Sequence, residues 1–344
     1  MQNDNIQVLD KIALVNLDVH TWSGRKKLRP EDIKGHVPPK KLASLGSKRI
    51  VDPKSVATFE TLKRRAERLL GSVGIRLMGT YAVPLDRAEE LVAELSSIRE
   101  EFNTKKSLFL QSYDQSVEAW ITEQEEWGSI IRSAITPVAE VRNQLSFGWQ
   151  VFHVQPTSID DSGLDDQIGG MAGQLFSEIS REASRCFEDS FLMKLKVGQR
   201  ALRPLRSIQE KLKGLSFLDG RAFAVSEFLD ETLNSIPKVG SIEGEPLNKL
   251  FGLLVVLSST SKIAEYGQAL LDGHTIGDKD LIALSGLDEY EDDDISGLGS
   301  IHQAVEKGMV AEAEVEGSDS YEIPSPAASV AKPISTVSAH EGWF

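Results

Sequence analysis

Basic residues near the N-terminus are the clearest candidate for a binding site in this sequence, and they would bind anions. Nucleic-acid binding needs such positive density beside phosphates, and an aromatic ring next to it can stack on an unpaired base. Residues 1–80 carry 16 Lys and Arg against 8 Asp and Glu. The candidate contact residues are Trp22, Arg25, Lys26, Lys27, Arg29, Lys40, Lys41, Arg64 and Arg65.

Two other interpretations of these basic residues stay open. They can form an ordinary solvated surface, or a face that meets an acidic partner. Residues 272–344 carry 3 Lys and Arg against 16 Asp and Glu, so this chain's own C-terminal part is one such acidic partner. The net charge of −14 hides this division between a basic head and an acidic tail.

The C-terminal pair Trp343 and Phe344 follows a polar stretch. Two large aromatic residues on a flexible tether, beside a free carboxylate, suit capture by a pocket on another protein. The alternative is that this pair has no role.

No catalytic signature is visible. The six histidines stand at no metal-ligand spacing, and the sequence contains no HExxH, GxSxG or P-loop motif. Cys186 falls on the apolar stripe of a predicted helix, which is typical of a core residue. The acidic residues around Asp160 and Asp165 lack the EF-hand order and suit a helix cap. We therefore predict a protein that is not an enzyme and has no cofactor or metal.

Composition places the chain among folded proteins without disulfides. Its 344 residues are 40% hydrophobic, enough for one large domain or two modest ones. A single cysteine excludes an intrachain disulfide framework and a four-cysteine zinc site. Met1–Asp10 has no apolar signal segment, and the apolar stretch Leu247–Leu257 is too short to span a membrane. We expect a cytoplasmic protein with no membrane span.

Residues 1–85 are predicted to form a small basic α/β module. Residues 12–19 alternate as a strand, with Ala13, Val15, Leu17 and Val19 on one face. A basic, proline-rich connector follows, and Asp52-Pro53 begins a helix that runs to about Leu70. Residues 74–83 are predicted to form a second short strand or an extended segment.

Residues 86–285 are predicted to form a long-helix domain. Apolar residues recur every three or four positions from Leu91 to Trp120 and again from Leu164 to Cys186. A helix of about 40 residues needs a partner helix that covers its apolar stripe. The two stripes therefore predict a long antiparallel helical hairpin, similar to a coiled coil, with a strand-like insert near residues 146–154. The second pattern is expected to continue through Leu192, to kink or restart near Pro204 and to end at Leu215, and two shorter helices are expected at residues 221–235 and 246–271.

Residues 286–344 are acidic and rich in Ser and Pro, a composition that predicts a disordered tail. The predicted fold class is thus mainly α, with a small N-terminal α/β module, a helical hairpin and this tail.

Several strings resemble the domain of unknown function 3150 family of bacteria, their phages and mobile elements. They are residues 17–28 (LDVHTWSGRKKL), 42–53 (LASLGSKRIVDP), 81–84 (YAVP) and 146–150 (SFGWQ). The resemblance covers roughly residues 8–280 and brings no established activity. Members are often encoded beside a MoxR-type AAA+ ATPase and a von Willebrand A-domain protein, so it implies these two proteins as partners.

The sequence therefore predicts a non-enzymatic interaction or self-assembling structural protein, acting with the AAA+ ATPase and von Willebrand A-domain proteins. A homo-oligomer is compatible with the predicted hairpin. The alternative is a nucleic-acid-binding protein of a phage, plasmid or other mobile element that uses the basic module.

Overall fold

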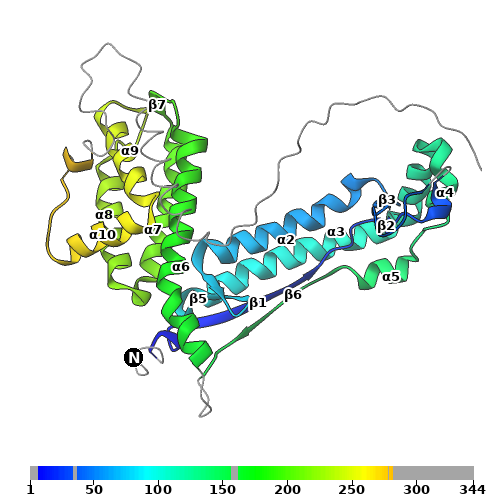
Figure 1. The fold of residues 1–344 in the computed structure, drawn as a ribbon, viewed down its shortest axis with the longest axis horizontal. Coiled ribbons are helices and arrows are strands. Elements are labelled where there is room, and N and C mark those ends of the chain that lie inside the picture. The colour runs from blue at the N-terminus through cyan, green and yellow to red at the C-terminus, as the bar shows by residue number, and fades with distance from the viewer. Residues whose placement is uncertain (1–6, 34–36, 156–161, 278, 282–344) are drawn as a thin grey trace, which may run out of the picture.

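The computed structural model describes residues 7–33, 37–155, 162–277 and 279–281. Within them the chain is mainly helical, with a small N-terminal sheet. Figure 1 shows two parts: an elongated arm, formed by residues 12–152, and a helical body, formed by residues 162–281. The predicted tail, with Trp343 and Phe344, lies outside the described residues.

A four-stranded antiparallel sheet runs along the arm in the order β4-β5-β1-β6. Its strands are β1 (Ile12–His20), β4 (Ile75–Leu77), β5 (Thr80–Pro84) and β6 (Ser146–Phe152). β6 is the aromatic segment expected near residues 146–154, and it pairs with β1 from Leu14↔Phe152 to His20↔Ser146. Because β6 joins the N-terminal strands, this sheet contains residues from beyond the predicted 1–85 module.

Strand β1 separates the two cores of the protein. Ala13, Val15 and Val19 pack into the arm core, and Leu17 lies partly buried against it, as the alternation predicted. Ile12 and Leu14 point to the opposite face and join the body core. The base of β1 is therefore buried on both faces, whereas its outer end carries exposed polar residues on one face.

The arm is built around two antiparallel helices, α2 (Pro53–Val73) and α3 (Ala88–Glu123). Asp52 caps α2 by accepting a hydrogen bond from the Lys54 amide at 2.9 Å, and Pro53 occupies the first turn. Phe59 of α2 meets Phe102 and Phe109 of α3 edge-on, at ring-centroid distances of 5.1 and 5.7 Å. Two short helices, α4 (Gly128–Arg132) and α5 (Val138–Asn143), follow α3.

The predicted hairpin between residues 86–120 and 164–186 is not confirmed. The long stripe of α3 packs on α2 in the arm core, and the stripe of α6 (Ser162–Cys186) lies in the body core. The reason is topological: the short β4–β5 hairpin returns the chain directly from α2 to α3, which places these two stripes together. The helical pair thus exists, but its members are α2 and α3.

In the body, α6 packs against α7 (Leu202–Gly214), α9 (Glu245–Leu257) and α10 (Thr260–Leu271), and α8 (Gly220–Ser235) packs against α7 and α10. α6 ends in a π-helical turn at Phe187–Phe191, so the predicted continuation to Leu192 is not a regular helix. A two-stranded ladder joins β7 (Lys196–Val197) to β8 (Ile242–Glu243).

The single helix predicted at residues 246–271 is wrong, because the chain breaks at Ser258 and Ser259. Ser259 caps α10 by accepting a hydrogen bond from the Lys262 amide, which lets a new helix begin there. Within the described residues no single helix is long and apolar enough to cross a membrane, and α9 and α10 reach that threshold only as a pair bent by 107°.

Candidate anion-binding site at the arm tip

The outer end of the arm carries a small basic hairpin. Strand β2 (Arg25–Lys27) pairs antiparallel with β3 (Ser47–Arg49), which places Arg25 opposite Arg49 and Lys26 opposite Lys48. Like charges directly opposite each other in a ladder destabilise it. The hairpin therefore concentrates positive charge at a cost to its own stability.

Contacts with α3 hold the hairpin in place. The Trp22 ring packs against Phe109 and Tyr113, at centroid distances of 6.0 and 5.7 Å. Trp120 donates its indole N–H to the Arg49 carbonyl oxygen at 3.2 Å. These contacts hold the hairpin in a fixed position against the arm core.

Among the described residues, Lys48 is the one hairpin cation that a buried carboxylate neutralises. Its Nζ lies 2.7 Å from both Asp32 oxygens, and both side chains are about nine-tenths buried. Asp32 also accepts a hydrogen bond from the Arg29 amide at 2.8 Å. These bonds, the one from Lys48 above all, lower the pKa of the Asp32 carboxyl. The pair joins the 30–32 turn to β3.

A pocket of about 1160 Å³ opens beside the hairpin, and we call it the arm-tip pocket. Its basic lining residues are Lys26, Lys27, Arg29, Lys40 and Lys48. None of the described lining residues is Asp or Glu, and apart from Lys48 these cations form no ion pair with another described residue. Anions therefore meet an attractive potential with no fixed counter-charge on its wall.

The rest of the arm-tip pocket is mostly apolar. Leu28, Leu45 and the proline-rich stretch 37–39 form one side, and Ser133–Ala134–Ile135, which follow α4, form the other. Tyr113 donates its hydroxyl to the Thr136 carbonyl oxygen at 2.7 Å and so fixes the 133–135 wall to α3. The pocket thus combines cations with an apolar surface.

The predicted contact residues divide into several places. Lys26, Lys27, Arg29 and Lys40 line the arm-tip pocket, and Arg25 and Arg64 line a neighbouring pocket of about 430 Å³ with Arg49 and Glu60. Lys41 is exposed beside the arm-tip pocket without lining it, and Arg65 pairs with Glu101 at 3.0 Å.

The position of Trp22 contradicts its predicted role in contacting a nucleic-acid base. Only 4% of the residue is exposed and its ring lies in the arm core, so it cannot stack on a base. Sequence reasoning also missed Asp32 and the 133–135 wall. The wall carries no local signal, because it comes from a segment more than 80 residues beyond the hairpin.

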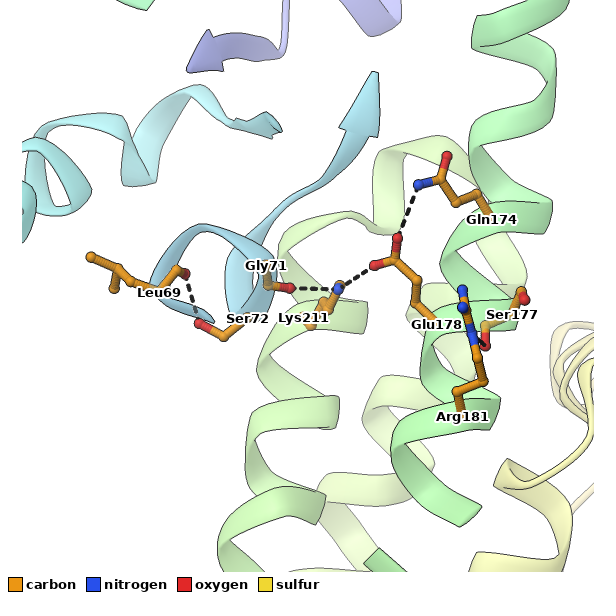
Figure 2. Close-up of polar contacts among 8 residues, drawn as sticks. All are labelled: Leu69, Gly71, Ser72, Gln174, Ser177, Glu178, Arg181 and Lys211. Carbon is orange, nitrogen blue, oxygen red and sulfur yellow. Dashed lines mark hydrogen bonds and ion pairs between the residues drawn. The ribbon is translucent and has the colours of Figure 1, made fainter. Parts of the chain in front are cut away.

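A second polar cluster lies where the arm joins the body (Figure 2). Lys211 of α7 donates to the Gly71 carbonyl oxygen of α2 and to Glu178 of α6, both at 2.7 Å. Gln174 donates to the other Glu178 oxygen at 2.9 Å. A cleft of about 960 Å³ beside it is lined by arginines and by Glu67, Glu178, Glu182 and Asp189, so it favours neither sign of charge.

Within the described residues no group of three or more His, Cys, Asp or Glu is arranged to hold a metal ion. Cys186 is buried, and burial raises the pKa of its thiol to about 12, so the thiol stays protonated near neutral pH.

Comparison with known families decides where the chain belongs. Residues 9–259 match the family described as a protein of unknown function, DUF3150. The chain belongs to this family. The DUF3150 match begins just before β1 and ends at Ser259, so it spans the arm, the arm-tip pocket and most of the body. No curated protein and no solved structure matches the chain significantly.

Proposed function

We propose that this DUF3150 protein is a non-enzymatic interaction protein, able to self-assemble, whose arm-tip pocket binds an acidic segment of a protein. The observation that carries the proposal is the pocket lining, in which Lys26, Lys27, Arg29 and Lys40 face no carboxylate among the described lining residues. Acidic side chains entering the pocket would supply the missing counter-charges.

The hairpin itself supports this function. Lys26 stands opposite Lys48, but Asp32 already neutralises Lys48, so the Lys26 charge is the one of this pair left for a ligand in the pocket. A carboxylate bound at Lys26 supplies the missing counter-charge, so binding and the local stability of the hairpin reinforce each other. A purely structural hairpin gains nothing from this arrangement.

The apolar walls favour a peptide over a bare phosphate chain. Leu28, Leu45 and Ile135 give apolar side chains a surface to bury, at about 25 cal/mol per Å² of apolar area. Ile135 is 39% exposed, which leaves area to cover. A peptide that alternates acidic and apolar residues uses both parts of the pocket.

The arm suits a docking role by its length. α3 contains 36 residues, about 54 Å at 1.5 Å per residue, and its pairing with α2 makes a stiff shaft that resembles a short coiled coil. The shaft carries the pocket away from the body, so a large partner can reach it. We propose the cytoplasmic MoxR-type AAA+ ATPase and von Willebrand A-domain protein, named by family resemblance, as these partners.

Co-expression with the AAA+ ATPase and the von Willebrand A-domain protein tests the proposal. We expect the wild-type chain to co-purify with at least one of them. The triple variant Lys26→Glu, Lys27→Glu, Arg29→Glu should lose the complex, whereas Arg200→Glu, Arg203→Glu, Arg206→Glu, an equal charge change on the exposed body, should retain it. If the wild type, the pocket variant and the control variant all recovered the same amount of partner, that result would contradict a docking role for the pocket.

Nucleic acid is the second candidate ligand. The observation that favours it is the neighbouring pocket, where Arg25, Arg49 and Arg64 extend the positive surface to the other side of the hairpin. A salt-dependent electrophoretic shift tests this candidate, because phosphate contacts weaken steeply as salt rises. Absence of a shift at about 50 mM salt would exclude it.

A further inference from the structure

We infer that the acidic segment 288–294 of one copy of this chain binds the arm-tip pocket of a second copy, so that the copies join head to tail. The inference rests on the proposed function of the pocket and names an occupant for it.

The segment and the pocket are complementary in charge. Residues 288–294 read Asp-Glu-Tyr-Glu-Asp-Asp-Asp, and Leu287 and Ile295 flank them. The pocket offers Lys26, Lys27, Arg29 and Lys40 without an opposing carboxylate among its described lining residues. Opposite charges in this number steer association and hold it at low ionic strength.

The segment also matches the apolar part of the pocket. Tyr290 stands among the acidic residues, and its ring, with Leu287 and Ile295, is the kind of side chain that Leu28, Leu45 and Ile135 can cover. A run of carboxylates alone would use only the cations of the pocket.

The length of chain between the body and the acidic segment decides whether the segment can bind the pocket of its own copy or only that of a second copy. Leu281 is fixed in the body, where it is 1% exposed and its backbone lies directly against Gly252 of α9. Asp294 follows 13 residues later, so it reaches at most about 45 Å from Leu281 when fully extended. Its bound form must curve around side chains, which shortens that reach.

The arm is longer than this reach. Trp120, whose indole binds the hairpin at Arg49, stands 32 residues after Ala88 at the base of α3, a rise of about 48 Å. Figure 1 places α9 in the body beyond the base of the arm, and Leu281 lies against Gly252 of that helix. The acidic segment therefore cannot reach the pocket of its own copy, and a second copy must supply the pocket.

This pairing joins two different surfaces. The pocket of one copy takes the segment of the next, and each new copy brings a free pocket and a free segment. Such a heterologous contact extends into a ring or an open filament and does not stop at a two-fold dimer.

Sedimentation velocity on mixtures of two full-length variants tests the inference. The head variant is Lys26→Glu, Lys27→Glu, Arg29→Glu, and the tail variant is Glu291→Gln, Asp292→Asn, Asp293→Asn, Asp294→Asn. We expect the wild-type chain to form species larger than dimers as its concentration rises. Each variant alone should assemble only at a concentration at least about tenfold higher than the wild type, because the Kd of the contact rises at least about tenfold.

The mixture gives the decisive result. An equimolar mixture contains one intact pocket, on the tail variant, and one intact segment, on the head variant, so it should form a heterodimer and stop. A control with Glu312→Gln, Glu314→Gln, Glu316→Gln removes acidic charge elsewhere and should assemble like the wild type.

Three outcomes would overturn the inference: a wild-type chain that stays monomeric up to about 100 μM, a variant that assembles alone at the same concentration as the wild type, or assembly that nuclease treatment abolishes. These failures are separate from failure of the proposed function. A monomeric wild type whose head variant still loses its co-purified partner would leave the docking role intact and remove only the second copy as occupant.

Discussion

Lys211 of α7 donates a hydrogen bond to the carbonyl oxygen of Gly71, in the last turns of α2, at 2.7 Å. These two residues stand 140 positions apart in the sequence, one in the body and the other in the arm. The same ammonium group binds Glu178, so a single buried cation ties α2, α6 and α7 together. The contact joins the arm to the body, together with Ile12 and Leu14 of β1, which pack in the body core.

Replacing Lys211 with Met should lower the free energy of unfolding by about 2–3 kcal/mol. Loss of one partner from a buried pair costs about 3–5 kcal/mol, but Glu178 keeps some solvent and its bond from Gln174. Lys213→Met is the control, because its pair with Glu227 is exposed and should contribute less than about 1 kcal/mol. Chemical denaturation compares them, and equal losses would contradict a structural role for Lys211.

Gly24 should tolerate a side chain less well than Gly46. Both have positive φ, +65° and +77°, which costs an alanine about 1 kcal/mol at either position. At Gly24 the added Cβ would also lie 2.8 Å from Cγ2 of Val51, whereas nothing lies within 4 Å at Gly46. We expect Gly24→Ala to lower the melting temperature more than Gly46→Ala, and the reverse order would contradict the packing at the hairpin.

The Asp32–Lys48 pair should make the stability of the arm tip depend on acid. Because the folded state lowers the pKa of Asp32, its charge stabilises the fold above the unfolded pKa near 4, and this contribution is lost as pH falls through the folded pKa. The stability difference between the wild type and Asp32→Asn should therefore shrink between pH 6 and pH 3. A difference that grows towards low pH would contradict the pairing.

Cys186 should resist thiol reagents in the folded chain. Burial raises the pKa of its thiol to about 12 and hides the sulfur, so little thiolate is available at pH 8. We expect reaction with a disulfide reagent within minutes only after denaturation, in a stoichiometry of one per chain. Rapid reaction under native conditions would show an accessible thiol.

Local patterns predicted the elements well. The alternation through Ala13, Val15 and Val19 gave the correct core face of β1, and Asp52-Pro53 marked the start of α2. Both features depend only on residues that are close together in the sequence. Family membership also followed from local strings, because the match runs from residue 9 to 259.

Long-range partners could not be read in the same way. The stripes of α2, α3 and α6 share the same helical spacing, so spacing cannot select which two meet; the short β4–β5 connection makes that choice. Trp22 stands beside Arg25 in the chain, yet its ring turns into the arm core. Ile135 completes the arm-tip pocket from a segment that no local pattern links to the hairpin.

Fluorescence anisotropy with two labelled ligands tests the central claim most directly. One ligand is a peptide with the sequence of residues 286–296, and the other is a single-stranded oligonucleotide of equal charge, each titrated with full-length protein at the same salt. We predict that the peptide binds more tightly and that Lys26→Glu, Lys27→Glu, Arg29→Glu weakens it at least about tenfold. Tighter oligonucleotide binding, or peptide binding that the triple variant leaves unchanged, would contradict the account.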